Sequence, residues 1–164
     1  MGYRELLLVL LSSVLLTLLM VQINANAVDS QDALQQLEIA HTAASVGQQF
    51  IEEAKSKKFD AVSDIIDDAD MPDDFTAWNS LGPGAWESYP NFNDVDDYNG
   101  YTGTVTVNSV PYSVSITVVY VRDSNLKNAY NQETYFKKMT VTVTSSYMEN
   151  SVVLRQVYSY FGVD

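Results

Sequence analysis

Cysteine is absent from this chain of 164 residues, and proline, glycine and histidine are scarce, with four, seven and one copies respectively. The lack of cysteine excludes disulfides and thiolate metal sites. The single histidine, His41, has no second histidine with which to form a ligand pair, so we expect a packed or surface side chain there. A phosphate-binding glycine loop, an HExxH motif and a nucleophile elbow are also missing. The sequence therefore predicts no enzyme.

Basic residues are few as well. Nine lysines and arginines stand against 21 aspartates and glutamates, which leaves a net charge of -12. Such a chain repels phosphate backbones. We therefore expect no nucleic-acid partner.

Charged side chains are missing altogether from Leu6 to Ile23. The polar side chains in this run are Ser12, Ser13, Thr17 and Gln22. As a helix the run is about 18 residues or ~27 Å long, close to the thickness of a bilayer core. Glu5 stands at its leading edge, where a charge facing hydrocarbon is costly unless it is paired.

Two ordinary interpretations apply to this N-terminus. In the first it is a signal peptide, with Arg4 as the charged end, Leu6 to Met20 as the apolar core and cleavage after Ala27 to release a secreted binding module. The acid Glu5 does not fit that interpretation, because such a region is normally basic. In the second the run is a simple membrane anchor, which leaves Glu5 unexplained.

The helical pattern continues after Ile23. From Asn24 to Lys57 there is no proline, and Gly47 is the only glycine. Small and apolar residues recur there at steps of three and four, which predicts a helix lying on a sheet; they are Leu37, Ala40, Ala44, Gly47, Ile51 and Ala54. Polar side chains are expected on the opposite side, namely Asp32, Gln35, Gln36, Gln49, Glu52 and Glu53.

The middle of the chain is less regular. Residues 59–66 have the pattern of a short helix. An acidic loop follows from Asp67 to Asn99, and its interspersed aromatic residues indicate a loop pinned onto the domain rather than a disordered linker.

From Gly100 onward the apolar residues recur at every second position, which is the spacing of a β-strand. Alternation over 101–107 and 112–121, with a turn at 108–111, predicts one hairpin. Alternation over 136–144 and a final strand over 152–161 predict a second. The expected fold is α+β, a long N-terminal helix packed on a four-stranded antiparallel sheet. Its parts are a hydrophobic helix (1–25), an amphipathic continuation (26–57), an acidic connection (58–100) and the sheet (101–164).

The opening Met1-Gly-Tyr-Arg-Glu5 followed by leucines, together with this order of elements, resembles type IV pilins and pseudopilins. In sequence the resemblance covers about the first 23 residues, and beyond them it is one of architecture. It implies a structural subunit of an extracellular pilus-like filament, with Met1 as the mature, often methylated first residue. Gln22 stands where these proteins often have proline, so we expect an unbroken helix.

The resemblance also implies partners and assembly residues. Before assembly the subunit would sit in the cytoplasmic (inner) membrane, where a prepilin peptidase and the pilus assembly machinery act on it. Identical subunits would then pack through their helices, with Glu5 paired to the α-amino group of Met1 on a neighbour. The implied assembly residues are Met1, Glu5, Leu6, Leu7, Leu10, Val14 and Leu18. A pseudopilin or minor pilin of a type II-like secretion system is the alternative within this class.

One stretch has the character of a cation site. Asp94, Asp96, Asp97 and Asn99 precede Gly100 and resemble part of a calcium loop. The glutamate that ends such a loop is replaced by Thr106. The alternative is a solvated acidic turn before a strand. A second acidic cluster with weaker spacing comprises Asp67, Asp68, Asp70, Asp73 and Asp74.

Overall fold

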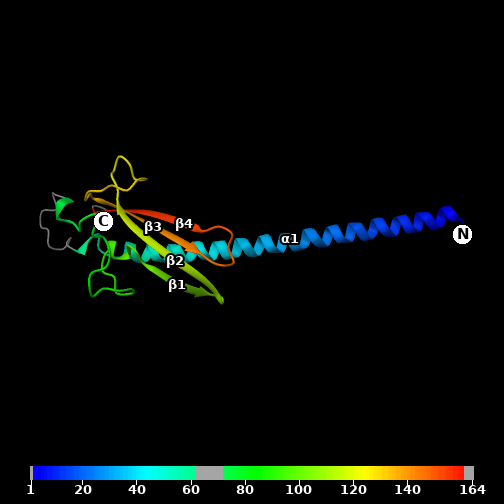
Figure 1. Cartoon of the computed structure of the whole chain (residues 1–164), viewed down its shortest axis with the longest axis horizontal. Coiled ribbons are helices and arrows are strands. Elements are labelled where there is room, and N and C mark those ends of the chain that lie inside the picture. Colours follow the sequence, from blue (N-terminus) through cyan, green and yellow to red (C-terminus); the bar gives the residue numbers. More distant parts are fainter. Residues whose placement is uncertain (1, 62–71, 161–164) are drawn as a thin grey trace. The chain divides into compact units, whose positions relative to one another are not determined.

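A computed structural model describes residues 2–61 and 72–160 of the chain. The chain divides into two compact units, Met1–Ile39 and Ala40–Asp164. The first is helical, and the second contains the end of that helix and the sheet (Figure 1).

Helix α1 (Tyr3–Lys55) is one uninterrupted α-helix of 53 residues. This confirms the continuous helix expected from the absence of proline, including at Gln22. It ends at Lys55, two residues before the expected Lys57, and the chain leaves it through a turn in which Ser56 N donates to Glu53 O at 3.1 Å. The positive charge of Lys55 in the last turn favours this end electrostatically.

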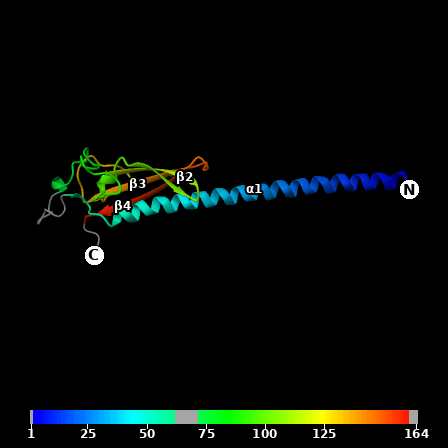
Figure 2. The same cartoon turned by 90° about the horizontal axis from the view of Figure 1, so that it is seen from below.

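The four strands form one antiparallel sheet in the order β1-β2-β3-β4, as the sequence predicts. Their bounds are β1 (Thr102–Val107), β2 (Val110–Tyr120), β3 (Phe136–Thr144) and β4 (Val152–Ser159). The bounds of β3 match the prediction, whereas β4 ends two residues early. Residues 40–55 of α1 run along one side of the sheet (Figure 2).

The core of the second unit lies between that part of α1 and the inner sheet face. In β2 and β3 every second residue is buried, and cross-strand partners such as Val114 and Val143, or Ile116 and Val141, share the inner face. The helix approaches closely at Gly47, where an added Cβ atom would come within 2.9 Å of Leu154 Cδ1.

The apolar stripe predicted for the helix is wrong in part. Gly47, Ile51 and Ala54 are buried as expected, but Leu37 is exposed and Ala40 and Ala44 are half-buried. The sheet covers a wider helical face than one narrow stripe, because the bulky side chains beside it also pack inward. The buried residues that the prediction missed are Ile39, Ala43, Val46 and Phe50.

Glu53 also departs from its predicted solvent-facing role. It is half-buried, and its carboxylate accepts hydrogen bonds from Tyr98 Oη at 2.8 Å and Tyr89 Oη at 3.2 Å. The aromatic loop therefore covers this side of the helix, which explains why a charged residue lies there with partners.

Between helix and sheet the described residues are mostly irregular. Phe59 and Asp60 belong to no helix, and residues 62–66 of the predicted short helix lie outside the described part of the chain. Lys58 instead forms an isolated parallel bridge with Asp94. Residues 72–101, which the structure describes, include two short 3-10 helices, η2 (Pro72–Asp74) and η3 (Asp96–Tyr98).

The first hairpin is tighter than predicted. Its turn consists of Asn108 and Ser109, with φ values of 50° and 67°, while Pro111 already lies in β2 opposite Thr106. Two successive positive φ angles are the signature of a type I′ turn, whose twist matches that of the strands.

This turn generates a stability prediction. Glycine is the preferred second residue of a type I′ turn, and serine is strained there. We expect Ser109→Gly to raise the free energy of unfolding by about 0.5–1 kcal/mol. Thermal unfolding of the detergent-solubilised chain measures this. Ser113→Gly, within β2, is the matched control and should destabilise; equal effects from both variants would contradict the turn assignment.

Candidate functional site

The N-terminal apolar segment, Leu6–Ile23 of α1, is the first candidate. Its large hydrophobic side chains are 54 to 65% exposed, and the most apolar 18-residue window of the helix has a mean hydropathy of 2.6 with none of it buried. By length and composition it is sufficient to cross a membrane. The predicted assembly residues in this segment are all exposed, namely Leu6, Leu7, Leu10, Val14 and Leu18.

The hydroxyl groups within this segment have partners inside the helix. Ser12 and Ser13 donate to the carbonyls of Val9 and Leu10 at 2.9 and 2.8 Å, and Thr17 donates to the carbonyl of Ser13 at 2.8 Å. A hydroxyl bonded to its own helix needs no partner from the surroundings. These three side chains therefore do not oppose transfer of the segment into an apolar environment.

Glu5 lies at the beginning of the helix. Its Oε2 atom accepts a hydrogen bond from the backbone N–H of Gly2 at 3.2 Å, and its own N–H donates to Gly2 O at 2.9 Å. A carboxylate at a helix N-terminus is favoured by the helix dipole. Met1, the expected intermolecular partner, lies outside the described residues.

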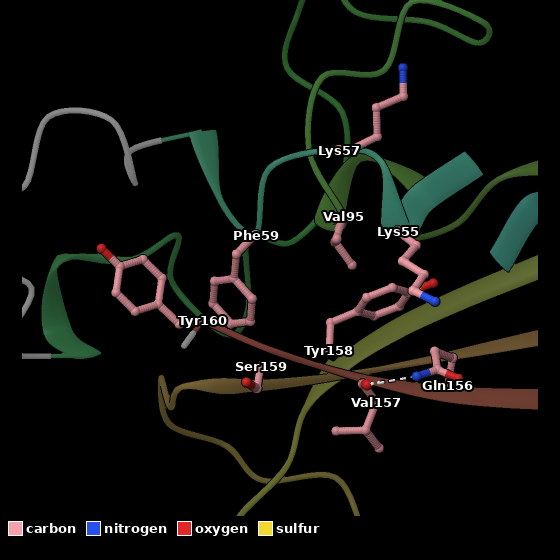
Figure 3. A pocket seen from close by; sticks show the side chains of 9 residues that line it. All are labelled: Lys55, Lys57, Phe59, Val95, Gln156, Val157, Tyr158, Ser159 and Tyr160. Carbon is pink, nitrogen blue, oxygen red and sulfur yellow. Dashed lines mark hydrogen bonds between the residues drawn. The ribbon is translucent and has the colours of Figure 1, made fainter. Parts of the chain in front are cut away.

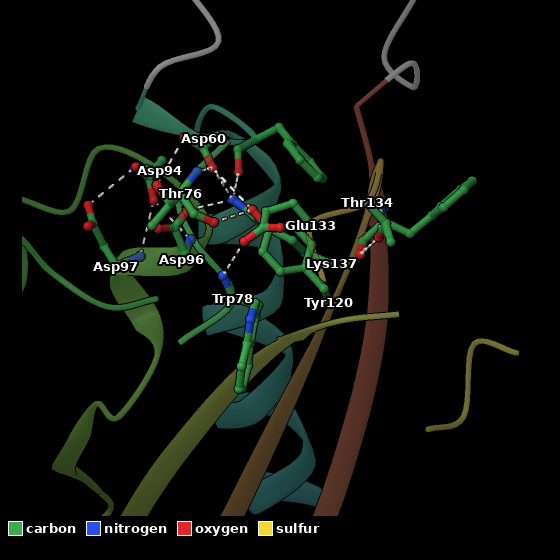
Figure 4. Close-up of polar contacts among 12 residues, drawn as sticks. Asp60, Thr76, Trp78, Asp94, Asp96, Asp97, Tyr120, Glu133, Thr134 and Lys137 are labelled. Atoms are coloured by element: carbon green, nitrogen blue, oxygen red, sulfur yellow. Dashed lines mark hydrogen bonds and ion pairs between the residues drawn. The ribbon is translucent and has the colours of Figure 1, made fainter. Parts of the chain in front are cut away.

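Two of the predicted calcium residues, Asp94 and Asp97, accept hydrogen bonds from the backbone around η3. Asp94 Oδ1 accepts from the N–H groups of Asp96 at 2.9 Å and Asp97 at 3.1 Å (Figure 4). Asp97 Oδ2 accepts from Asn93 N at 2.8 Å. Reciprocal bonds of this kind hold an acidic turn in place without a cation.

Asn99 points elsewhere. Its Oδ1 atom accepts from Val118 N at 2.9 Å, and its Nδ2 atom donates to Leu81 O at 2.9 Å, so the side chain joins the loop to β2. Within residues 2–61 and 72–160, no group of three or more acidic or histidine side chains is arranged to hold a metal ion. Calcium stays a prediction. Of the second acidic cluster, Asp67, Asp68 and Asp70 lie outside the described residues, and so does the side chain of Asp73.

The structure reveals a buried charge cluster that sequence reasoning missed. Lys137 of β3 is fully buried, and its Nζ atom donates to Asp96 Oδ1 at 2.6 Å, to Asp60 Oδ2 at 2.8 Å and to Phe59 O at 2.8 Å (Figure 4). The rings of Phe59 and Tyr120 stand 4.5 and 5.3 Å from the nitrogen. Asp60, Asp96 and Lys137 form what we call the lysine cluster.

Asp60 in this cluster is held from several sides. Its Oδ2 atom accepts from Thr76 N at 3.0 Å, and its Oδ1 atom accepts from Thr76 Oγ1 at 3.1 Å. Tyr120 Oη lies 3.5 Å from Oδ2 and donates to Thr76 O at 2.8 Å. Burial, with the charge of Asp60 as the next cause, raises the pKa of Tyr120 far above its usual value, so this hydroxyl keeps its proton.

Asp94 adjoins the cluster on the side of Asp96. Burial, followed by the charge and hydrogen bonding of Asp96, raises the pKa of Asp94 to about 8. Burial is also the largest cause that raises the pKa of Asp97. Two carboxyl groups can share a small buried space when one of them stays protonated near neutral pH. Here the protonated group is Asp94.

A surface pocket of about 410 Å³ opens between the end of α1 and β4. Lys55 and Lys57 stand at one side, and Phe59, Tyr158 and Tyr160 supply ring surface (Figure 3). Tyr158 Oη is engaged in donating to Ile51 O at 2.9 Å. Among the residues that the structure describes, no carboxyl group or histidine lines this pocket to pair with the lysines as acid and base.

Comparisons with known proteins identify no relative. No protein-family model matches the chain, and no curated protein or solved structure matches it either.

The raised pKa of Asp94 predicts a pH dependence. Between its ordinary value of 3.8 and about 8, the folded chain holds a proton that the unfolded chain releases, so stability should fall as pH rises through this range. An asparagine at this position would retain the Oδ1 acceptor but carry no titrating proton. We expect Asp94→Asn to flatten the dependence. At about 1.4 kcal/mol per pH unit over roughly four units, its gain over wild type at pH 8 relative to pH 4 is at most about 5 kcal/mol.

Unfolding of the full chain at several pH values between 4 and 9 measures this. Asp123→Asn, which removes a carboxylate from an exposed loop, is the matched control and should follow the wild type. Parallel curves for wild type and Asp94→Asn would contradict the assignment.

Proposed function

We propose that this chain is a structural subunit of a type IV pilus-like extracellular filament, which polymerises through the N-terminal apolar segment. The observation that carries the proposal is the exposure of the apolar side chains of that segment. Leu6–Ile23 exposes large apolar side chains on all sides of the helix, and the second unit of the chain has a separate core of its own. An apolar surface of this extent requires a cover other than water.

Before assembly, the cover is the membrane. The segment is long enough to span a bilayer core, and its serine and threonine hydroxyls are bonded within the helix. The acidic sheet unit remains on the aqueous side, outside the cell. The cytoplasmic membrane, a prepilin peptidase and the assembly machinery are then the partners of the unassembled subunit.

In the filament, the same surface packs against the segments of neighbouring subunits. Leu6, Leu7, Leu10, Val14 and Leu18 lie within it. The apolar side chains move from lipid to protein without passing through water, so extraction from the membrane keeps their hydrophobic stabilisation. Close packing between helices stabilises the filament further.

Glu5 determines how neighbours are aligned. A carboxylate enclosed among apolar helices is costly without a counter-charge, and the Gly2 N–H at 3.2 Å is a single neutral donor. The α-amino group of Met1 on an adjacent subunit is the partner that the pilin resemblance implies. Pairing of the two would fix the axial register, since other registers leave both charges buried alone.

Removing the charge of Glu5 tests the proposal. We expect Glu5→Gln to reduce the number of filaments by at least about tenfold. Removing one charge of a buried pair leaves the other buried without a partner, which costs about 3–5 kcal/mol. Filaments are sheared from cells that produce the chain together with its assembly machinery, and they are counted by negative-stain electron microscopy. The membrane-bound subunit should accumulate, and its sheet unit should unfold at an unchanged temperature.

Asp32→Asn is the matched control, because it removes one carboxylate from an exposed position on the same helix. It should leave the filaments intact. Wild-type numbers of filaments from Glu5→Gln would remove the register role, and the absence of filaments from the wild type itself would remove the proposed function.

A further inference from the structure

Two groups that can react with each other meet at the base of the sheet unit. Lys137 comes from β3, Asp60 comes from the segment after α1, and both are fully buried. Lys137 Nζ lies 2.8 Å from Asp60 Oδ2, which places the amine against the carboxyl group (Figure 4). The two residues are far apart in sequence, so the fold alone brings them together.

We propose that Lys137 and Asp60 condense into an intramolecular amide, in which Lys137 Nζ bonds to Asp60 Cγ and one water molecule is released. The product is a covalent link between β3 and the segment that leaves α1. This inference is independent of the proposed filament, because it concerns the sheet unit alone.

Burial favours the reaction in two ways. Inside the fold the amine and the carboxyl group are held at contact distance, and a well-oriented intramolecular pair has an effective concentration of up to about 10⁵–10⁸ M. A buried site also excludes bulk water, which would otherwise compete with the amine, and both side chains are fully buried. The rings of Phe59 and Tyr120 beside Nζ supply an apolar setting.

Asp96 is the group that moves the protons. Its Oδ1 atom lies 2.6 Å from Lys137 Nζ, and its side chain is 3% exposed. It takes one proton from the ammonium and passes it to an oxygen of the Asp60 carboxylate, which leaves a neutral amine and a carboxylic acid. The lone pair of the amine then attacks Cγ of Asp60. A second proton leaves the nitrogen as the tetrahedral intermediate collapses, and it goes to the departing hydroxyl. Ammonium plus carboxylate thus yields amide plus water, without an oxidant or cofactor.

Thr76 stabilises the charge that forms on Asp60 in this step. Its backbone N–H bonds Oδ2 at 3.0 Å, and its hydroxyl bonds Oδ1 at 3.1 Å. Donors already placed on the carboxyl oxygens act on the tetrahedral intermediate in the same manner as an oxyanion hole. This asymmetry selects Asp60 as the acyl partner and Asp96 as the proton carrier.

The link would supply what the composition excludes. A chain without cysteine has no disulfide, and an amide between residues 60 and 137 closes a long loop that includes the acidic connection and the first hairpin. Closing a loop of this length lowers the entropy of the unfolded chain, as a disulfide does.

The mass of the intact, denatured full-length chain tests the proposal. We expect it to be lower by one water molecule than the mass of the same chain without the link. Proteolysis followed by tandem mass spectrometry should give a branched peptide that contains both Lys137 and Asp60. A measured mass equal to that of the unlinked chain, or a branched peptide that joins Lys137 to Asp96, would overturn the proposal.

Variants separate the amide from a buried ion pair and from water loss elsewhere. Lys137→Arg keeps the positive charge but has no reactive amine, so it should show the full mass. Asp96→Asn keeps both reacting groups and should also lose the link, because the proton acceptor is gone. Lys138→Arg, the adjacent lysine on β3, is the matched control and should keep the water loss. Water loss that persists in Lys137→Arg would contradict the proposal.

Discussion

The uncovered apolar surface of α1 is the constraint on which this account of the molecule depends. From Leu6 to Ile23 the helix has large hydrophobic side chains on every side, and they find no cover within their own unit. At about 25 cal/mol per Å² of apolar area, such a surface is too costly to leave in water. The internal hydrogen bonds of Ser12, Ser13 and Thr17 extend the same property to three of the four polar positions, Gln22 being the fourth. Membrane insertion and helix–helix packing are two solutions to this one constraint, and the proposed filament subunit would use them in turn.

The sheet unit satisfies its own constraints separately. Its core is a two-layer arrangement of residues 40–55 of α1 and the inner sheet face, with Gly47 permitting close approach. Lys137 lies in this core with two carboxylates, Asp60 and Asp96, around it. A buried lysine is tolerated because each donor of its ammonium has an acceptor, so loss of either carboxylate would leave charge unpaired. The same hydrogen bonds hold the amine of Lys137 against the carboxyl group of Asp60, as the proposed condensation requires.

Much of the fold follows from patterns in the sequence. Alternation predicted the strands and their order, and the absence of proline predicted the continuous helix. The narrow stripe through Leu37 failed, because it did not anticipate that Val46 and Phe50 widen the buried face. The lysine cluster was missed for a different reason. Lys137 is in phase with Met139, Val141 and Val143, a signal that the residue points inward, but a charge at a core position identifies its partners only through tertiary contacts. Asp60 and Asp96 come from loops whose positions no periodicity predicts.

The central claim is that subunits bury the N-terminal apolar segment against one another, and a single introduced thiol tests it most directly. The chain has no native cysteine, so Leu10→Cys carries the only thiol. In filaments transferred to detergent-free buffer, we expect this thiol to resist a charged maleimide until the filaments are dissolved in denaturant. Trp86→Cys, at a side chain 98% exposed in the single chain, is the reference for a freely accessible thiol. Labelling of Leu10→Cys in intact filaments at the rate of Trp86→Cys would contradict the account.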